Sequence, residues 1–394
     1  METSDPSKGE TSFIKDFNPE IKVASPGRIN LIGEHTDYNM GFVMPTAIDK
    51  KIYFELRKNG HPSKCNIHSA TFNAGFTFDL NSFEKSSKNW ENYILGVINE
   101  IHKLDKTLQG FDCIIQSELP IGAGISSSAA LECGLATGLN SLFNLKLSGK
   151  DIVFLSQAAE NNFVGSQCGI MDQYASVLSK EGNLILLDCL HLEAEYIPAT
   201  FENCKILLIN TKVSHSLADG EYNTRRRECE TALEIIKQHY TEVKTLRDVT
   251  KDMLTIIKEK LSEKQTNRVL YVLEENQRVL RGSDYLKEGD LREFGELMFQ
   301  SHDGLKNLYE VSCPELDFLV DFVKDKDFVY GARMMGGGFG GCTINIIEKD
   351  KIEKLENELV EAYETAFGIK PEFITVFPSG GTEVEELRKV RTSN

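Results

Sequence analysis

The sequence predicts a two-domain α+β protein, and three observations lead to this expectation. The chain has 394 residues, whereas a single domain takes roughly 150. Up to residue 209, segments with the two-residue period of strands alternate with segments of helical period. Residues 225–305 are dense in Glu, Lys, Arg and Leu at helical spacing, which predicts a helical block. This change of character places the domain boundary near residue 205, so we expect domains at 1–205 and 206–394.

Local periodicity predicts the individual elements in order along the chain. In the first domain we expect strands at 21–24, 51–57, 111–117 and 184–187, a helix at 89–101 and an Ala/Leu-rich helix after 126, and we expect the second domain to open with a strand at 206–209. Beyond the helical block we expect strands at 330–335, 342–347 and 373–377 and a helix at 352–367. Residues 1–18 are polar and lack a period, so an arm or loose helix is expected there.

Composition excludes several classes of function. The formal net charge is −16, and an acidic surface repels nucleic-acid phosphate and anionic lipid. No window approaches 18 uninterrupted apolar residues, so no membrane span is expected. The first twenty residues carry charges without an apolar core, which argues against a signal peptide. We therefore expect a cytoplasmic globular protein without nucleic-acid or membrane partners.

The cysteines and histidines do not form a metal motif. The nine cysteines are separated by at least 15 residues, and the eight histidines contain no HxxxH pair. Closely spaced pairs are what zinc sites and redox motifs require. We expect reduced, buried thiols rather than a zinc or iron centre.

A glycine- and serine-rich segment lies between a predicted strand and a predicted helix. Residues 119–131 read LPIGAGISSSAAL, in which Gly122 and Gly124 permit positive φ and a close approach of the backbone to an anion. The backbone N–H groups of residues 127–129 would lie at the helix N-terminus, where the helix dipole favours negative charge. The segment is neither GxxxxGK[ST] nor GxGxxG. A triphosphate-binding loop and an ordinary glycine turn both remain open from these residues alone.

Two further segments concentrate unusual residues. Residues 26–39 hold Arg28, Glu34, His35 and Asp37 among two glycines, a set that could ring a polyhydroxylated ligand or form a solvated loop. Residues 336–342 read GGGFGGC and are flanked by apolar segments. So many glycines favour a close approach of the backbone to a ligand or another chain segment. Cys342 has no basic neighbour in sequence, so we expect it to be buried and unreactive.

In this order, the three segments resemble the three motifs of the GHMP small-molecule kinase superfamily. Residues 27–39, GRINLIGEHTDYN, resemble the signature of its galactokinase branch, and the resemblance extends from about residue 20 to 385. Further matching strings are CGIMDQ at 168–173, EYNTRRR at 221–227 and YEVSCPELD at 309–317. The resemblance implies an N-terminal domain like ribosomal protein S5, a ferredoxin-like C-terminal domain with added helices, and an active site in the interdomain cleft.

The resemblance implies transfer of the γ-phosphoryl group of ATP to the anomeric hydroxyl of D-galactose. It assigns Asp172 as the catalytic carboxylate and Arg28 as the active-site arginine. An arginine beside Asp172 would hold it ionised and stabilise the charge that builds up on the transferred phosphoryl group. Whether Asp172 removes the proton or only orients the hydroxyl stays open at this point.

The remaining assignments also come from the resemblance. The implied sugar-binding residues are Glu34, His35, Asp37, Gly169, Asp172 and Tyr222. The implied ATP-binding residues are Trp90, Tyr93, Gly122, Ala123, Gly124, Ile125, Ser126, Ser127 and Ser128. Mg²⁺ is the expected metal, with Ser128 and Glu160 as its protein ligands.

Other functions remain open within the same resemblance. The protein could be a related sugar 1-kinase acting on N-acetylgalactosamine or arabinose, or a sensor that binds galactose and ATP without turnover. Thr36 and Asn39 favour the galactose branch. The serine loop is complete and both Arg28 and Asp172 are present, which favours an enzyme. We expect galactose and MgATP as small-molecule partners and a monomeric protein.

Overall fold

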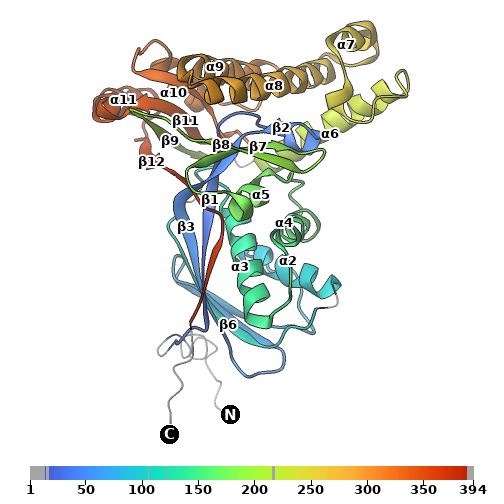
Figure 1. Cartoon of the computed structure of the whole chain (residues 1–394), viewed down its shortest axis with the longest axis vertical. Coiled ribbons are helices and arrows are strands. Elements are labelled where there is room, and N and C mark those ends of the chain that lie inside the picture. The colour runs from blue at the N-terminus through green and yellow to red at the C-terminus, as the bar shows by residue number, and fades with distance from the viewer. Residues whose placement is uncertain (1–13, 15–16, 105, 121, 215–217, 388–394) are drawn as a thin grey trace.

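Two sheets, one built mainly from each half of the chain, organise the molecule (Figure 1). The computed structural model describes residues 14, 17–104, 106–120, 122–214 and 218–387. Most of the arm predicted at 1–18 lies outside the described residues. Among those described, no helix combines the length and the apolar character needed to cross a bilayer.

The first sheet has the strand order β14-β1-β3-β6-β4-β5, and β13 pairs with β3. Neighbouring strands are antiparallel except for β4 and β6. Its strands are β1 (Ile21–Asn30), β3 (Pro45–Lys58), β4 (Lys64–Ser69), β5 (Ala74–Asp79), β6 (Phe111–Ser117), β13 (Pro378–Ser379) and β14 (Glu383–Glu386). The helices beside it are α2 (Asn89–Lys103), α3 (Ser127–Phe143), α4 (Gly149–Ala158) and α5 (Met171–Leu178), with α4 continuing into the π-helical turn η2 (Ala159–Val164) (Figure 1).

The second sheet is antiparallel with the order β10-β11-β9-β12. It consists of β9 (Cys204–Ser214), β10 (Val329–Met334), β11 (Gly340–Glu348) and β12 (Glu372–Val376). A small sheet of β2 (Phe42–Val43), β7 (Asn183–Asp188) and β8 (Glu193–Pro198) accompanies the two main sheets. The helices of this half are α6 (Ala218–Lys237), α7 (Lys251–Ile257), α8 (Glu263–Glu288), α9 (Leu291–Asn307), α10 (Pro314–Lys324) and α11 (Ile352–Phe367). Short 3-10 turns occur at η1 (Asp37–Asn39), η3 (Leu246–Asp248), η4 (Lys258–Lys260) and η5 (Lys349–Lys351).

Helix α3 lies unusually close to the first sheet because small residues face it. A Cβ on Gly134 would come within 2.2 Å of the Phe54 ring, and one on Gly138 within 2.8 Å of Leu56. Phe54 and Leu56 are fully buried under the helix. This packing fixes the axis of α3, and therefore the direction in which its N-terminus points.

The structure bears out most of the expected elements, including α2, β6 and α11, and it corrects two features. Strand β1 extends to Asn30, so Arg28 lies within a strand and only the residues after it form a turn. The chain also returns to the first sheet after β12, where β14 pairs with β1 (Figure 1). A single boundary near residue 205 does not anticipate this return, although β9 does begin the second sheet at Cys204.

Candidate functional site

A polar cavity of about 170 Å³ collects residues from distant parts of the chain. The turn after β1, the helices α5 and α6, and the glycine loop before β11 all contribute to its wall. Predicted site residues that line it are Arg28, Glu34, His35, Asp37, Glu160, Asp172 and Tyr222. Gly169 also lies here, since a Cβ at this position would come within 1.9 Å of the Asp37 carboxylate. The structure therefore brings the expected sugar-binding residues together.

Arg28 and Asp172 form a two-pronged ion pair at this cavity. The Arg28 Nε donates to Asp172 Oδ1 at 2.6 Å, and its Nη2 donates to Asp172 Oδ2 at 2.8 Å. The third arm, Nη1, donates to the Gly124 carbonyl at 2.8 Å, and the Ser126 hydroxyl also donates to Asp172. Burial disfavours the charged guanidinium, but the charges of Asp172 and Glu34 outweigh it and raise the pKa of Arg28. The carboxylate is thus held in one orientation by three donors.

Local backbone structure explains how Arg28 reaches this position. Strand β1 shifts register against β3 between Pro26 and Arg28, and the Arg28 N–H donates to the Ile125 carbonyl at 3.0 Å. A Cβ on Gly27 would lie 2.8 Å from the same carbonyl oxygen. Glycine is therefore needed at position 27 for the serine loop to approach the strand.

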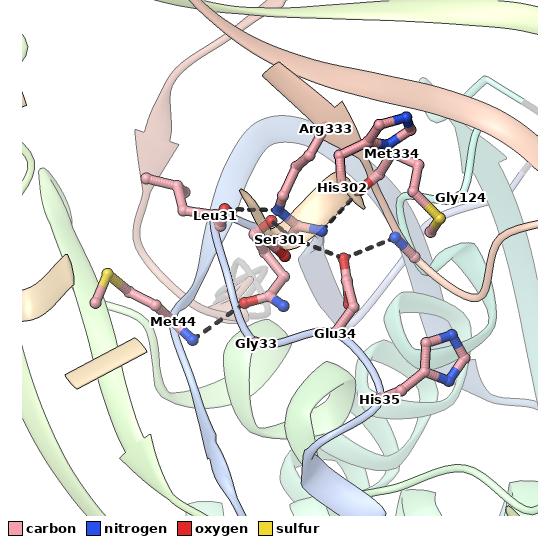
Figure 2. Close-up of polar contacts among 12 residues, drawn as sticks. Leu31, Gly33, Glu34, His35, Met44, Gly124, Ser301, His302, Arg333 and Met334 are labelled. Carbon is pink, nitrogen blue, oxygen red and sulfur yellow. Dashed lines mark hydrogen bonds and ion pairs between the residues drawn. The ribbon is translucent and has the colours of Figure 1, made fainter. Parts of the chain in front are cut away.

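Glu34 joins the turn after β1 to the glycine loop. Its Oε1 accepts from the Gly336 N–H at 2.7 Å and from Arg333 Nη2 at 3.1 Å (Figure 2). The side chain is almost completely buried but still reaches the cavity wall. One carboxylate oxygen is thus already engaged within the protein, which the sequence did not indicate.

His35 is held inside an aromatic cluster and already has protein partners. Its Nδ1 lies 2.8 Å from the Tyr38 hydroxyl and its Nε2 lies 3.3 Å from the Gly337 carbonyl oxygen. The rings of Tyr222 and Tyr309 lie about 5 Å away, at 5.3 and 4.9 Å between centroids. Burial, and then repulsion by nearby arginines, lower the pKa of His35 to about 3. The imidazole is therefore neutral at pH 7.

Asp37 is a buried carboxyl at the start of η1. Burial, and then the negative charges of Asp172 and Glu34, raise its pKa to about 7, although backbone N–H groups of Tyr38 and Met171 oppose the shift. A group in this state is poised between neutral and charged forms near physiological pH. A ligand hydroxyl that donates to Asp37 would favour the charged form.

The serine loop leads into α3 with its first amides available. Gly122 and Gly124 adopt positive φ values of 73° and 69°, as expected for a tight anion-binding loop. Ser126 at the N-cap has φ 57° and makes no side-chain cap, because its hydroxyl bonds Asp172 instead. The side chains of Ala123 and Ile125 are buried, so only their backbone could contact a ligand. The N–H groups at the start of α3 remain available for phosphate.

A second cavity of about 240 Å³ adjoins the other side of this loop. Trp90 and Tyr93 line it together with Ser127 and Ser128. The rest of the wall is mostly apolar, with the side chains of Ile52, Phe72, Ile115, Leu119 and Leu131 beside those of Ser69, Thr71 and Ser117. An apolar slot beside an anion-binding helix terminus suits a nucleotide, whose base is flat and whose phosphates are charged.

Glu160 lies in η2, where the helix widens into a π-turn. Its Oε2 accepts from Gln173 Nε2 at 2.8 Å. Burial and the charge of Asp172 raise its pKa to about 7, while a hydrogen bond from Ser128 lowers it. Behind it, burial and Glu160 raise the pKa of Glu132 well above the ordinary range. This crowding of carboxyls beside a serine hydroxyl would be relieved by a cation.

The described residues do not form a protein-only metal cage, since no group of three or more His, Cys, Asp or Glu among them is arranged to hold an ion. A hydroxyl and a carboxylate fit Mg²⁺ nonetheless, because this ion retains water ligands and also binds substrate phosphates. All nine cysteines are described and are free thiols, and all are buried as predicted except Cys168, which is half-buried. Burial raises the pKa of both Cys168 and Cys342, so neither is an activated nucleophile.

Family models match three parts of the chain. They are the "Galactokinase galactose-binding signature" at residues 11–58, the "GHMP kinases N terminal domain" at 92–180 and "GHMP kinases C terminal" at 283–365. The structure is similar to a solved mevalonate kinase of Methanococcus jannaschii, with a TM-score of 0.65 at 19% identity, covering 93% of this chain and 100% of that chain. The fold and the site therefore define a small-molecule kinase of the GHMP class, and the predicted two-domain architecture is confirmed.

Relatives with higher sequence identity show to which family within the GHMP class this chain belongs. Galactokinases of Thermosipho africanus and Thermotoga maritima are 45% and 42% identical to this chain, each over 92% of it and 99% of their own length. A solved galactokinase of Lactococcus lactis, complexed with galactose, has a TM-score of 0.90 and 32% identity, covering 97% of this chain and 99% of that one. This chain belongs to the galactokinase family.

We predict that Asp37→Asn changes the pH dependence of stability. The folded pKa of Asp37 is about 7 and its ordinary value is 3.8, so the stabilising contribution of the protonated form is complete below pH ~4 and is lost as pH rises through ~7. The asparagine side chain does not ionise, so the variant does not lose stability in this way. Its free energy of unfolding relative to that of wild type should therefore be higher at pH 8 than at pH 4. Urea unfolding at both pH values measures this difference. An equal effect at both pH values would contradict the prediction.

Proposed function

We propose that this protein transfers the γ-phosphoryl group of ATP to the anomeric hydroxyl of D-galactose, giving α-D-galactose 1-phosphate and ADP. The chain is a member of the galactokinase family and an ATP-dependent sugar kinase. The observation that carries the detailed proposal is the Arg28–Asp172 pair. It lies in the wall of the polar cavity and is tied by Gly124 and Ser126 to the serine loop.

The sugar occupies the polar cavity in this proposal. Asp37 and the second oxygen of Glu34 accept from ring hydroxyls, and neutral His35 and Tyr222 supply the surrounding wall. Burial and the nearby Asp37 raise the pKa of the Tyr222 hydroxyl well above its ordinary range, so it remains protonated. Gly169 contributes by leaving space against Asp37.

The nucleotide occupies the apolar cavity and the serine loop. The base packs against Trp90 and Tyr93 in the cavity wall, and the phosphates reach the N–H groups at the start of α3. The loop separates the two cavities, since Ser127 and Ser128 line one while Ser126 bonds Asp172 in the other. This arrangement points the terminal phosphate toward the sugar.

Asp172 acts on the attacking hydroxyl, and Arg28 fixes Asp172. The carboxylate accepts a hydrogen bond from the anomeric hydroxyl, which aims a lone pair of that oxygen at phosphorus and provides a place for the proton. Arg28 keeps the carboxylate charged and oriented through its two parallel bonds. Because phosphoryl transfer passes through a loose transition state, orientation and electrostatics account for most of the catalysis.

Mg²⁺ is part of the proposal, with the Ser128 hydroxyl and the Glu160 carboxylate as its protein ligands. When bound with ATP it supplies positive charge that offsets the charge on the phosphate oxygens. Gln173 holds Glu160 in place by its hydrogen bond at 2.8 Å. We further propose that the protein works as a monomer in the cytoplasm, to which its free thiols are suited.

The direct test is ADP release with a panel of sugars, with and without Mg²⁺. Galactose should give the highest kcat/KM, because an epimer leaves one buried acceptor without a partner. Such a loss costs about 1–3 kcal/mol, or roughly 5–150-fold in specificity. Equal or higher kcat/KM for glucose, N-acetylgalactosamine or arabinose would overturn the assignment of galactose. Galactose and ATP binding without ADP release would indicate a sensor.

Asp172→Asn should abolish most turnover while preserving the fold. The amide is isosteric but cannot take up the proton and has no charge to pair with Arg28. We expect kcat to fall at least about 100-fold, in the range attributed to general-base assistance, and galactose affinity to change by about tenfold or less. Single-turnover phosphoryl transfer paired with calorimetric galactose titration measures both. Near-wild-type turnover would remove Asp172 from this role.

Ser128→Ala and Glu160→Ala should impair the use of magnesium and nucleotide. We expect the Mg²⁺ concentration needed for half-maximal activity to rise at least about tenfold, the size of one lost charge-assisted contact. Galactose binding without nucleotide should stay within a few-fold. Ser148→Ala, which removes the side-chain cap of α4, serves as a control for general loss of stability. A large loss of galactose binding in a folded Ser128→Ala or Glu160→Ala protein would argue against their metal role.

A further inference from the structure

The Arg333 side chain is completely buried and makes four hydrogen bonds (Figure 2). Its Nε donates to the Leu31 carbonyl at 2.8 Å and its Nη1 to the Met334 carbonyl at 2.7 Å. Its Nη2 donates to the Asn30 carbonyl at 2.5 Å and to Glu34 Oε1 at 3.1 Å. All three nitrogens of the guanidinium are therefore engaged, and their acceptors lie around it in several directions.

The positions of these acceptors show what Arg333 connects. Asn30, Leu31 and Glu34 belong to the end of β1 and the turn that follows it, about 300 residues away in sequence. Arg333 itself lies on β10, three residues before Gly336 at the start of the glycine loop. That turn and that loop both contribute to the wall of the same cavity. The guanidinium thus links the two sheets at the sugar cavity.

The two oxygens of Glu34 have different environments. Oε1 accepts from both Arg333 and the Gly336 N–H, whereas Oε2 has no hydrogen-bond partner among the described residues. Glu34 nevertheless lines the cavity, and His35 beside it points in another direction (Figure 2). Fixing Oε1 with two donors leaves a single oxygen, in a defined orientation, for a ligand that donates a hydrogen bond.

We propose that Arg333 is a positioning residue for sugar recognition: it fixes Glu34 so that Oε2 accepts from one particular hydroxyl of galactose. This inference rests on the proposed function. Arg333 does not itself line the cavity, so its effect reaches the sugar through Glu34. Fixing an acceptor before the ligand arrives lowers the ordering cost of binding and penalises a sugar whose hydroxyl points elsewhere.

Arginine is required because a lysine ammonium cannot replace its planar fork. In Arg333→Lys the charge remains, but one nitrogen cannot serve acceptors as widely separated as Leu31, Met334 and Glu34. We expect the Kd and KM for galactose to rise about 10- to 100-fold, the size of one charge-assisted hydrogen bond. The KM for ATP and kcat at saturating galactose should stay within a few-fold. A purely structural defect would not produce this split.

Arg57→Lys provides the matched control. Arg57 also pairs with a buried carboxylate, Asp112, but it lies on β3 and lines neither of the two cavities. This variant should lose stability while keeping the galactose KM of wild type. The same rise in galactose KM for Arg57→Lys and Arg333→Lys would overturn the positioning role.

Monodeoxy galactoses identify the hydroxyl and test the route through Glu34. With the wild-type protein, one of the 2-, 3-, 4- and 6-deoxy sugars should bind at least about tenfold more weakly than galactose, because it lacks the hydroxyl that donates a hydrogen bond to Glu34. That penalty should shrink to a few-fold in both Arg333→Lys and Glu34→Gln. In the variant that combines Arg333→Lys with Glu34→Gln, the Kd for galactose should be at most a few-fold higher than in the weaker-binding single variant, because both changes remove the same interaction. Independent, multiplying losses would contradict the proposal.

A crystal structure of the wild-type protein with galactose decides the matter even if Arg333→Lys does not fold. We expect Glu34 Oε1 to keep its contacts with Arg333 and Gly336 while Oε2 accepts from a sugar hydroxyl. Loss of the Arg333 contact, or a Glu34 that does not touch the sugar, would overturn the inference. Absence of galactose turnover by wild type would overturn the proposed function and this role with it. Normal wild-type turnover with an unchanged galactose KM in Arg333→Lys overturns the Arg333 role alone.

Discussion

The ion pair between Arg28 and Asp172 is the interaction on which the rest of the site depends. It joins β1 to the first turn of α5, and its third arm reaches the Gly124 carbonyl of the serine loop. Removing Asp172 would leave the charge of the buried Arg28 side chain without its carboxylate partner at the edge of the cavity, which is unfavourable. The position of the proposed catalytic carboxylate and the path of the serine loop are therefore set by the same guanidinium.

Arg28 pairs with Asp172 and does not neutralise the other carboxyl groups of the site. Asp37 and Glu160 each have a pKa raised to about 7 by burial and neighbouring charge, and burial and the charge of Glu160 raise the pKa of Glu132 well above its ordinary range. Buried carboxyls of this kind reduce the stability of the ligand-free protein at neutral pH. Sugar hydroxyls and a divalent cation are groups that would stabilise these carboxylates in their charged form. The same carboxyls that lower the stability of the ligand-free protein would therefore contribute to ligand affinity. This strain lies where the ligands bind and not in the apolar cores.

The sequence predicts the local parts of this structure better than the long-range ones. The helices at 89–101 and 352–367 are predicted by periodicity, and the glycines and serines of the serine loop stand together in the chain. By contrast, Arg333 reads as an ordinary strand residue, and nothing near it in sequence indicates Glu34 as its partner. The strand at 383–386 consists largely of acidic residues, so its sequence resembles that of a solvated tail. Its pairing partner in β1, which includes Ile21, lies about 360 residues earlier in the chain, so no local pattern indicates the pairing. Contacts of this kind depend on the assembled sheets and leave no local pattern.

The most direct measurement of the central claim is a double-mutant cycle on phosphoryl transfer. Arg28→Lys, Asp172→Asn and the double variant are compared with wild type in single-turnover assays at saturating galactose and MgATP. If the two side chains act as one unit, the double variant should be no more than a few-fold slower than the slower single variant. Losses that multiply, so that the double variant is slower by the product of the two single effects, would show that the two residues act independently and would contradict this account.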